Sequence, residues 1–177
     1  MSSLYNPQIA RRTIFGSMKP MVVIGLGNIL LADEGVGIML LRALSHRSHE
    51  FPSADFIELG TGGMSVVHAM AGRRKAVVLD CARMGASPGT IRRFTPEAAR
   101  SANAPGSFSM HQGDILELIA VSRVIGALPE KIVIFGIEPE SLATGEKLSP
   151  SLQSRIPDYL AAISEELLQD AGPVRGS

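Results

Sequence analysis

Two adjacent carboxylates, Asp33 and Glu34, stand where an apolar, glycine-containing segment meets a helical pattern. Residues 21–24 form an apolar run that predicts a buried strand, and from Val36 apolar residues recur at the spacing of an amphipathic helix. The acids therefore belong to a strand-to-helix loop. In open α/β sheets such loops collect ligands and catalytic groups, so the two acids are candidates for metal binding or acid–base chemistry.

A second acid and a histidine occupy two later loops. Asp80 ends the apolar, β-branched run 75–79, and His111 lies just before a predicted helix. Loops at the carboxyl ends of neighbouring parallel strands share one rim of the sheet, so we expect Glu34, Asp80 and His111 to come together. Two carboxylates and one imidazole suit a borderline divalent ion, with further positions open to water or substrate.

Each of these residues also has a purely structural interpretation, which the sequence leaves open. Asp33 or Glu34 would complement the positive end of the following helix. Asp80 would form an Asx turn or a helix cap. His111 would be a capping histidine whose hydrogen bonds are satisfied.

The remaining histidines and the cysteine are expected to be structural. His46 and His49 are three residues apart near a predicted helix end, but their charged neighbours indicate a solvated terminus. His68 lies inside a short predicted helix. Cys81 has no motif that supplies a base, so a small buried residue is favoured over a nucleophile.

The glycines of the first loop resemble a dinucleotide-binding turn, but the spacing differs. Such a turn needs a third glycine three residues after the second, and after Gly27 that position is Leu30. Two acids at the mouth of the helix would also repel a phosphate. A metal or acid–base site is therefore favoured over a nucleotide site.

Composition excludes several other classes. The 177 residues include 17 basic and 17 acidic side chains and one cysteine, so no global charge favours nucleic acid or an anionic membrane. The lone cysteine fits a reducing compartment, and the longest apolar run, 21–32, is too short to span a bilayer. We expect a cytoplasmic monomer with one domain over 21–170, an N-terminal extension over 1–20 and a C-terminal tail over 171–177.

Strand and helix patterns alternate along this domain. Strands are predicted at 21–24, 55–59, 75–79, 90–94 and 132–137, and helices from 36 onward and at 64–71, 115–125 and 152–168. Pro157 should break or restart the last helix, and 96–110 reads as a surface loop. The alternation predicts an α/β fold with a mostly parallel sheet and helices on both faces.

Five segments, in this order, resemble the hydrogenase maturation endopeptidases, which trim the C-terminal tail from the large subunit of nickel-iron hydrogenases. The segments are GLGNILLADEGVG, ELGTGGM, LDCARMGASPGTIRRF, SMHQGDILELI and FGIEPESL. The resemblance runs from about Met21 to about Leu168. It implies a three-layer αβα sandwich around a twisted, mostly parallel five-stranded sheet.

The resemblance also implies roles for the three candidate residues. The family's metal-binding positions fall on Glu34, Asp80 and His111, which are taken to engage nickel already inserted in the large-subunit precursor. The nickel then belongs to the substrate and marks a precursor that is ready to be cut. An acid acting as general base and a nickel-polarised carbonyl or water are both open as the source of catalysis.

The chain departs from the family pattern at two positions, and two other functions are kept as alternatives. Leu59 replaces a glycine in the segment 58–64, and Cys81 stands where alanine is common, beside Asp80; whether its thiol joins the metal site is open. One alternative is a nickel-sensing chaperone that holds the precursor without cutting it. The other is a nucleotide-binding enzyme that uses the glycine loop.

Overall fold

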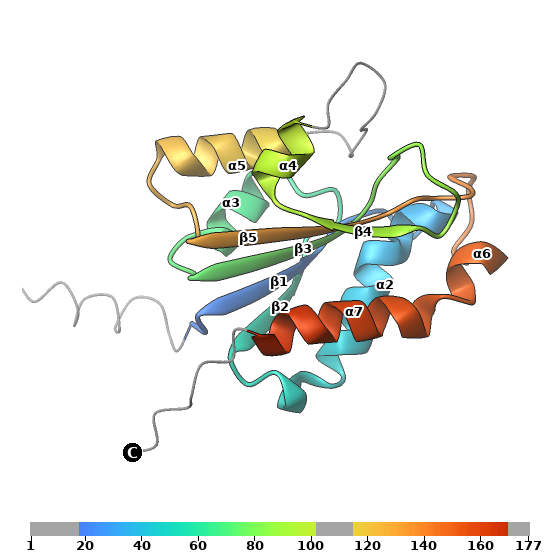
Figure 1. The fold of residues 1–177 in the computed structure, drawn as a ribbon, viewed down its shortest axis with the longest axis horizontal. Helices are drawn as coiled ribbons and strands as arrows, with labels where there is room; N and C mark the ends of the chain where they lie inside the picture. The colour runs from blue at the N-terminus through green and yellow to red at the C-terminus, as the bar shows by residue number, and fades with distance from the viewer. Residues whose placement is uncertain (1–17, 102–114, 170–177) are drawn as a thin grey trace, which may run out of the picture.

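The computed structural model describes residues 18–101 and 115–169, which form three layers (Figure 1). A central sheet separates one layer, containing helices α2 and α7, from another containing α3, α4 and α5. Each face of the sheet is covered by its own apolar core. The structure therefore confirms the predicted αβα sandwich.

The sheet has five strands in the order β2-β1-β3-β5-β4. All neighbouring pairs are parallel except β4 and β5, which are antiparallel. The central strand β3 is buried along its whole length, as a strand covered on both faces should be. The bounds are β1 Met21–Gly25, β2 Ala54–Glu58, β3 Lys75–Cys81, β4 Ile91–Phe94 and β5 Lys131–Ile137.

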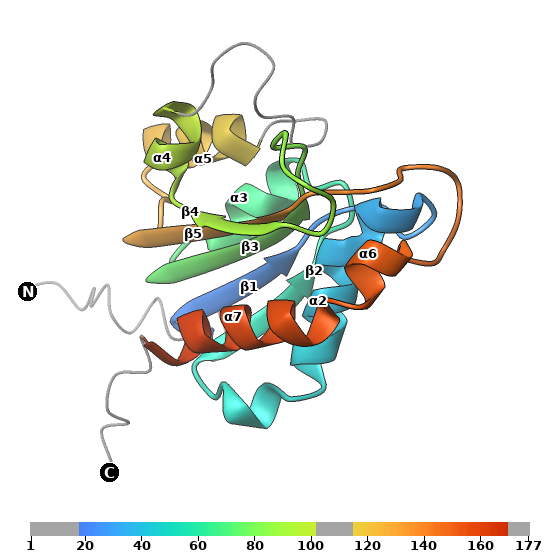
Figure 2. The same cartoon turned by 45° about the vertical axis from the view of Figure 1, so that its right-hand side comes forward.

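The helices cover the two faces as their apolar stripes require (Figure 2). Those on one face are α2 Val36–Ser45 and α7 Ile156–Gln169, and those on the other are α3 Met64–Met70, α4 Pro96–Ser101 and α5 Ile115–Val124. Shorter pieces are the 3₁₀ turns η1 Ala32–Gly35 and η2 Ser48–Glu50 and the single turn α6 Pro150–Gln153. None of the helices in the described ranges is both long enough and apolar enough to cross a membrane.

Two local predictions have different outcomes. The loop predicted over 96–110 is wrong for 96–101, which form α4, because Thr95 Oγ1 accepts the Ala98 N–H at 3.3 Å and Pro96 opens the helix. Residues 102–110 lie outside the described part of the chain. Pro157 does restart the last helix, since α6 ends at Gln153 and α7 places Pro157 in its first turn.

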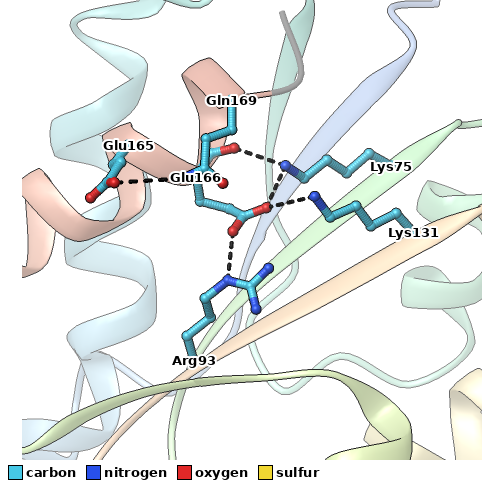
Figure 3. Close-up of polar contacts among 6 residues, drawn as sticks. All are labelled: Lys75, Arg93, Lys131, Glu165, Glu166 and Gln169. Carbon is cyan, nitrogen blue, oxygen red and sulfur yellow. Dashed lines mark hydrogen bonds and ion pairs between the residues drawn. The ribbon is translucent and has the colours of Figure 1, made fainter.

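An ion-pair cluster joins α7 to Lys75 and Lys131, which begin β3 and β5, and to Arg93 of the antiparallel β4 (Figure 3). The buried Glu166 carboxylate lies 2.6 Å from Lys75 Nζ, 2.6 Å from Arg93 Nε and 3.3 Å from Lys131 Nζ. Burial by itself would raise the pKa of Glu166, but hydrogen bonds from Arg93 and Lys75 outweigh it and hold the pKa at about 2. This cluster lies at the opposite edge of the sheet from the carboxyl ends of β1 and β3.

Candidate active site

A pocket opens at the carboxyl ends of β1 and β3, and Glu34 and Asp80 both line it. The structure thus brings together two of the three residues that the sequence singles out. The third, His111, lies outside the described residues. The other lining residues come from the loops after β1 and β2 and from α5: Leu26, Gly27, Gly60, Thr61, Gly62, Ile115 and Leu118.

Glycine packing positions Glu34. Gly27 has φ of 129°, and a Cβ built on it would lie 1.9 Å from the Glu34 carbonyl oxygen. Only glycine allows the turn that carries Glu34 to lie this close to the end of β1. Gly37, in the first turn of α2, has the same role towards β3, because a Cβ there would lie 2.3 Å from the Leu79 carbonyl oxygen.

Asp80 points to the same face of the sheet as Ala76 and Val78, towards α3 and α5. The residue is 1% exposed, and its Oδ1 has no hydrogen-bond partner among the described residues. Burial raises the pKa of Asp80 to about 7, the nearby Glu34 charge adds to this rise, and the backbone N–H of Cys81 opposes it. The pocket therefore holds an acid that is poised to titrate near neutral pH.

Two buried acids in one pocket suit a cation. A buried carboxylate oxygen without a donor carries an uncompensated desolvation penalty, which a divalent ion would remove. Within 18–101 and 115–169, no group of three or more His, Cys, Asp or Glu side chains is placed to hold a metal ion. Glu34 and Asp80 would therefore supply part of a coordination sphere, and further ligands would come from elsewhere.

Asp33 faces away from this pocket, although it directly precedes Glu34. Its Oδ2 accepts the backbone N–H groups of Glu140 and Ser141, both at 2.9 Å, and its Oδ1 accepts that of Ser149 at 2.7 Å. The side chain is fully buried. Sequence reasoning did not identify these contacts, because the donors lie 107 to 116 residues further along the chain.

Cys81 packs into the core on the α2 and α7 face, opposite to Asp80. Burial, together with the negative charge of Asp80, raises the pKa of its thiol well above the usual range. The thiol is thus protonated and turned away from the pocket. This placement agrees with a small buried residue and gives no support for a ligand role.

The three described histidines lie outside the pocket. His46, His49 and His68 are all exposed, the first two around the end of α2 and the third on α3. None of them lines the pocket that contains Glu34 and Asp80.

The segment that departs from the family pattern also has a clear local structure. Glu58 is held by Arg42 of α2 through two hydrogen bonds of 2.8 Å, so its carboxylate is engaged on the α2 side of the sheet. Leu59 packs against the core on the other face. A leucine is accommodated there because positive φ angles begin only at Gly60.

Comparison with known proteins identifies relatives along most of the chain. The family model for hydrogenase maturation protease matches residues 38–166. The chain is 30% identical over 146 residues to the hydrogenase 2 maturation protease of Escherichia coli, covering 80% of this chain and 87% of that protein. It is also 30% identical over 121 residues to the hydrogenase expression/formation protein HoxM of Cupriavidus necator, covering 68% of this chain but only 60% of HoxM.

Solved structures give the same result. The hydrogenase maturating endopeptidase HybD from Escherichia coli superimposes with a TM-score of 0.72 at 26% identity, covering 85% of this chain and 93% of that one. The similarity thus extends from sequence to the arrangement of the whole sandwich.

Proposed function

This chain belongs to the hydrogenase maturation protease family, and from that premise we propose that it is an endopeptidase acting on the precursor of a hydrogenase large subunit. It would remove the C-terminal extension once nickel has been inserted, working in the cytoplasm as a monomer. The observation that carries the proposal is the pocket shared by Glu34 and Asp80, in which the buried Oδ1 of Asp80 has no hydrogen-bond partner among the described residues.

In this proposal the nickel is part of the substrate. Glu34, Asp80 and His111 complete the coordination of an ion whose other ligands come from the precursor, and carboxylate and imidazole groups suit such an ion. A cation entering the pocket relieves the repulsion between the two acids and supplies Asp80 Oδ1 with a partner. Precursors without nickel gain neither effect, so the pocket distinguishes loaded from empty substrates.

Hydrolysis requires an activated water, and the same residues offer two routes to it. In one, a carboxylate takes a proton from water as the water attacks the scissile carbonyl, and the proton then passes to the departing amine. In the other, the nickel polarises the carbonyl or lowers the pKa of its bound water.

The test is cleavage of a nickel-loaded precursor, with the mass of the released peptide as the readout. We expect a shorter large subunit with wild-type protein and none when the precursor is metal-free. Glu34→Gln, Asp80→Asn and His111→Ala should each reduce processing severely, whereas His46→Ala, at the exposed end of α2, should not. Full cleavage by all three site variants would refute the assignment.

Two further results would redirect the proposal. A stable complex with loaded precursor that yields no shorter product would identify a nickel-sensing chaperone. Stabilisation by a nucleotide in a thermal-shift assay would instead favour a nucleotide-binding enzyme.

A further inference from the structure

We infer that Asp33 is a positioning residue that holds Glu34 at the pocket by binding the segment that follows β5. This inference rests on the proposed function, because it assigns Asp33 a role in the same reaction. The segment, residues 138–149, is called the strap. It runs beside the start of α2 (Figure 2).

The strap supplies every hydrogen-bond donor that the structure shows for the Asp33 side chain. Three backbone N–H groups point at the two carboxylate oxygens, at 2.7 to 2.9 Å. A fully buried carboxylate needs such bonds, since without them its desolvation would be uncompensated. The Asp33 backbone N–H adds a fourth contact by donating to the Ser141 carbonyl oxygen at 3.2 Å.

The turn that carries Glu34 includes a strained residue. It is a four-residue 3₁₀ turn without a side-chain cap at Leu31, and Ala32 has φ of 43°, a conformation that costs energy for a residue other than glycine. The strap stabilises this conformation. Ala32 N–H donates to the Gly145 carbonyl oxygen at 2.6 Å, and Gly145 N–H donates to that of Leu30 at 2.9 Å.

The strap also connects Glu34 to Asp80. It begins directly after β5, in which Gly136 pairs with Asp80 across the sheet. Its first residue, Glu138, makes hydrogen bonds to residues 84–90. Further along, the strap contacts the turn in which Asp33 and Glu34 are neighbours. By binding the strap, Asp33 therefore links β5, which pairs with the strand that carries Asp80, to the turn that carries Glu34. On its other side this turn packs closely against Gly27.

The first test compares two variants that replace a buried carboxylate by its amide. In Asp33→Asn the amide nitrogen cannot accept a hydrogen bond, so at least one strap N–H loses its partner. We expect kcat/KM on loaded precursor, per folded molecule, to fall about 10- to 100-fold, as small displacements of a reacting group produce. The control, Glu166→Gln, changes a buried acid at the opposite edge of the sheet. It should alter kcat/KM by less than about twofold.

The second test is amide hydrogen exchange, first in the wild-type protein, where it requires neither an active enzyme nor a variant that folds, and then in Asp33→Asn. Glu34 N–H, bonded to the Leu31 carbonyl oxygen, should exchange together with the strap amides of Glu140, Ser141 and Ser149, as one cooperative unit. In Asp33→Asn these four amides should lose protection while those of β3 keep theirs.

Each outcome decides the inference. Given an active wild-type protein, the inference is overturned if Asp33→Asn has the wild-type kcat/KM. It is also overturned if Glu166→Gln lowers kcat/KM as much as Asp33→Asn does. Exchange of Glu34 independently of the strap amides would overturn it as well. If wild-type protein does not cleave loaded precursor, the proposed function fails, and the exchange data still decide whether Asp33 holds Glu34 in place.

Discussion

Replacing Asp80 by Asn should make the protein more stable at alkaline pH while it abolishes processing. Asp80 is buried, Oδ1 has no donor among the described residues, and Glu34 shares its pocket. Ionised Asp80 therefore destabilises the folded state. Asparagine has almost the same shape but carries no charge, so it removes this penalty together with the carboxylate that we propose binds the metal.

The magnitude follows from the pKa. An aspartate that titrates at 3.8 when unfolded and at about 7 when folded binds its proton more tightly in the folded state. The stability that this proton contributes is complete below pH 3.8 and is lost as pH rises through about 7. Each unit of difference in pKa between the folded and unfolded states corresponds to 1.36 kcal/mol, so the loss in free energy of unfolding is about 4 kcal/mol. For a domain of this size it corresponds to about 10 °C in Tm.

The assay is urea and thermal unfolding of wild type and Asp80→Asn at pH 4 and pH 8. The difference in free energy of unfolding, Asp80→Asn minus wild type, should increase by about 4 kcal/mol in favour of the variant between pH 4 and pH 8. Glu130→Gln, the same change at an exposed position, should show no such growth. If Asp80→Asn were less stable than wild type at pH 8, or if the difference were the same at both pH values, the reasoning on burial would be refuted.

Three other predictions concern the surrounding structure and the substrate. Gly27→Ala should greatly reduce precursor cleavage, because the new Cβ would lie 1.9 Å from the Glu34 carbonyl oxygen; wild-type rates would contradict this. Glu166, with its pKa lowered from 4.5 to about 2, contributes about 3 kcal/mol that is present above pH 4.5 and lost as pH falls towards 2. Glu166→Gln should therefore be less stable at pH 7 and approach wild type below pH 3 in unfolding curves. Casein and a peptide copied from the cleavage region should not be hydrolysed in a mass-based assay, since neither supplies nickel or a folded scaffold; cleavage of the peptide at the precursor's rate would contradict this.

The fold was predictable wherever burial alone determines an element. The apolar runs that begin β1 and β3 and the helical spacing after Val36 correspond to elements of the structure. The strand predicted over 75–79 was expected to end at Asp80, whereas it continues to Cys81. Backbone pairing with Gly136 and Ile137 extends it, and this pairing depends on tertiary structure rather than on local polarity.

The candidate site was predictable in its location but not in its internal arrangement. Loops after parallel strands share one edge, so the meeting of Glu34 and Asp80 follows from strand order. The different directions of Asp33 and Glu34 do not follow from sequence, because Asp33 is oriented by strap amides more than 100 residues away. The raised pKa of Asp80 depends on burial, which sequence alone does not measure.

The two buried acids at opposite edges of the sheet act in opposite directions on the pH dependence of stability. Glu166 adds stability as pH rises from about 2 to 4.5, and Asp80 removes stability as pH rises from 3.8 to about 7, so together they favour folding most near pH 4 to 5. In that range Asp80 is protonated and a poor ligand. Near neutral pH it begins to ionise. Under the proposed function, a cation brought by the substrate would favour the ionised form and reverse the penalty. If the proposal is right, binding of nickel-loaded precursor should therefore stabilise this protein more at pH 8 than at pH 5, as measured by thermal unfolding with and without precursor.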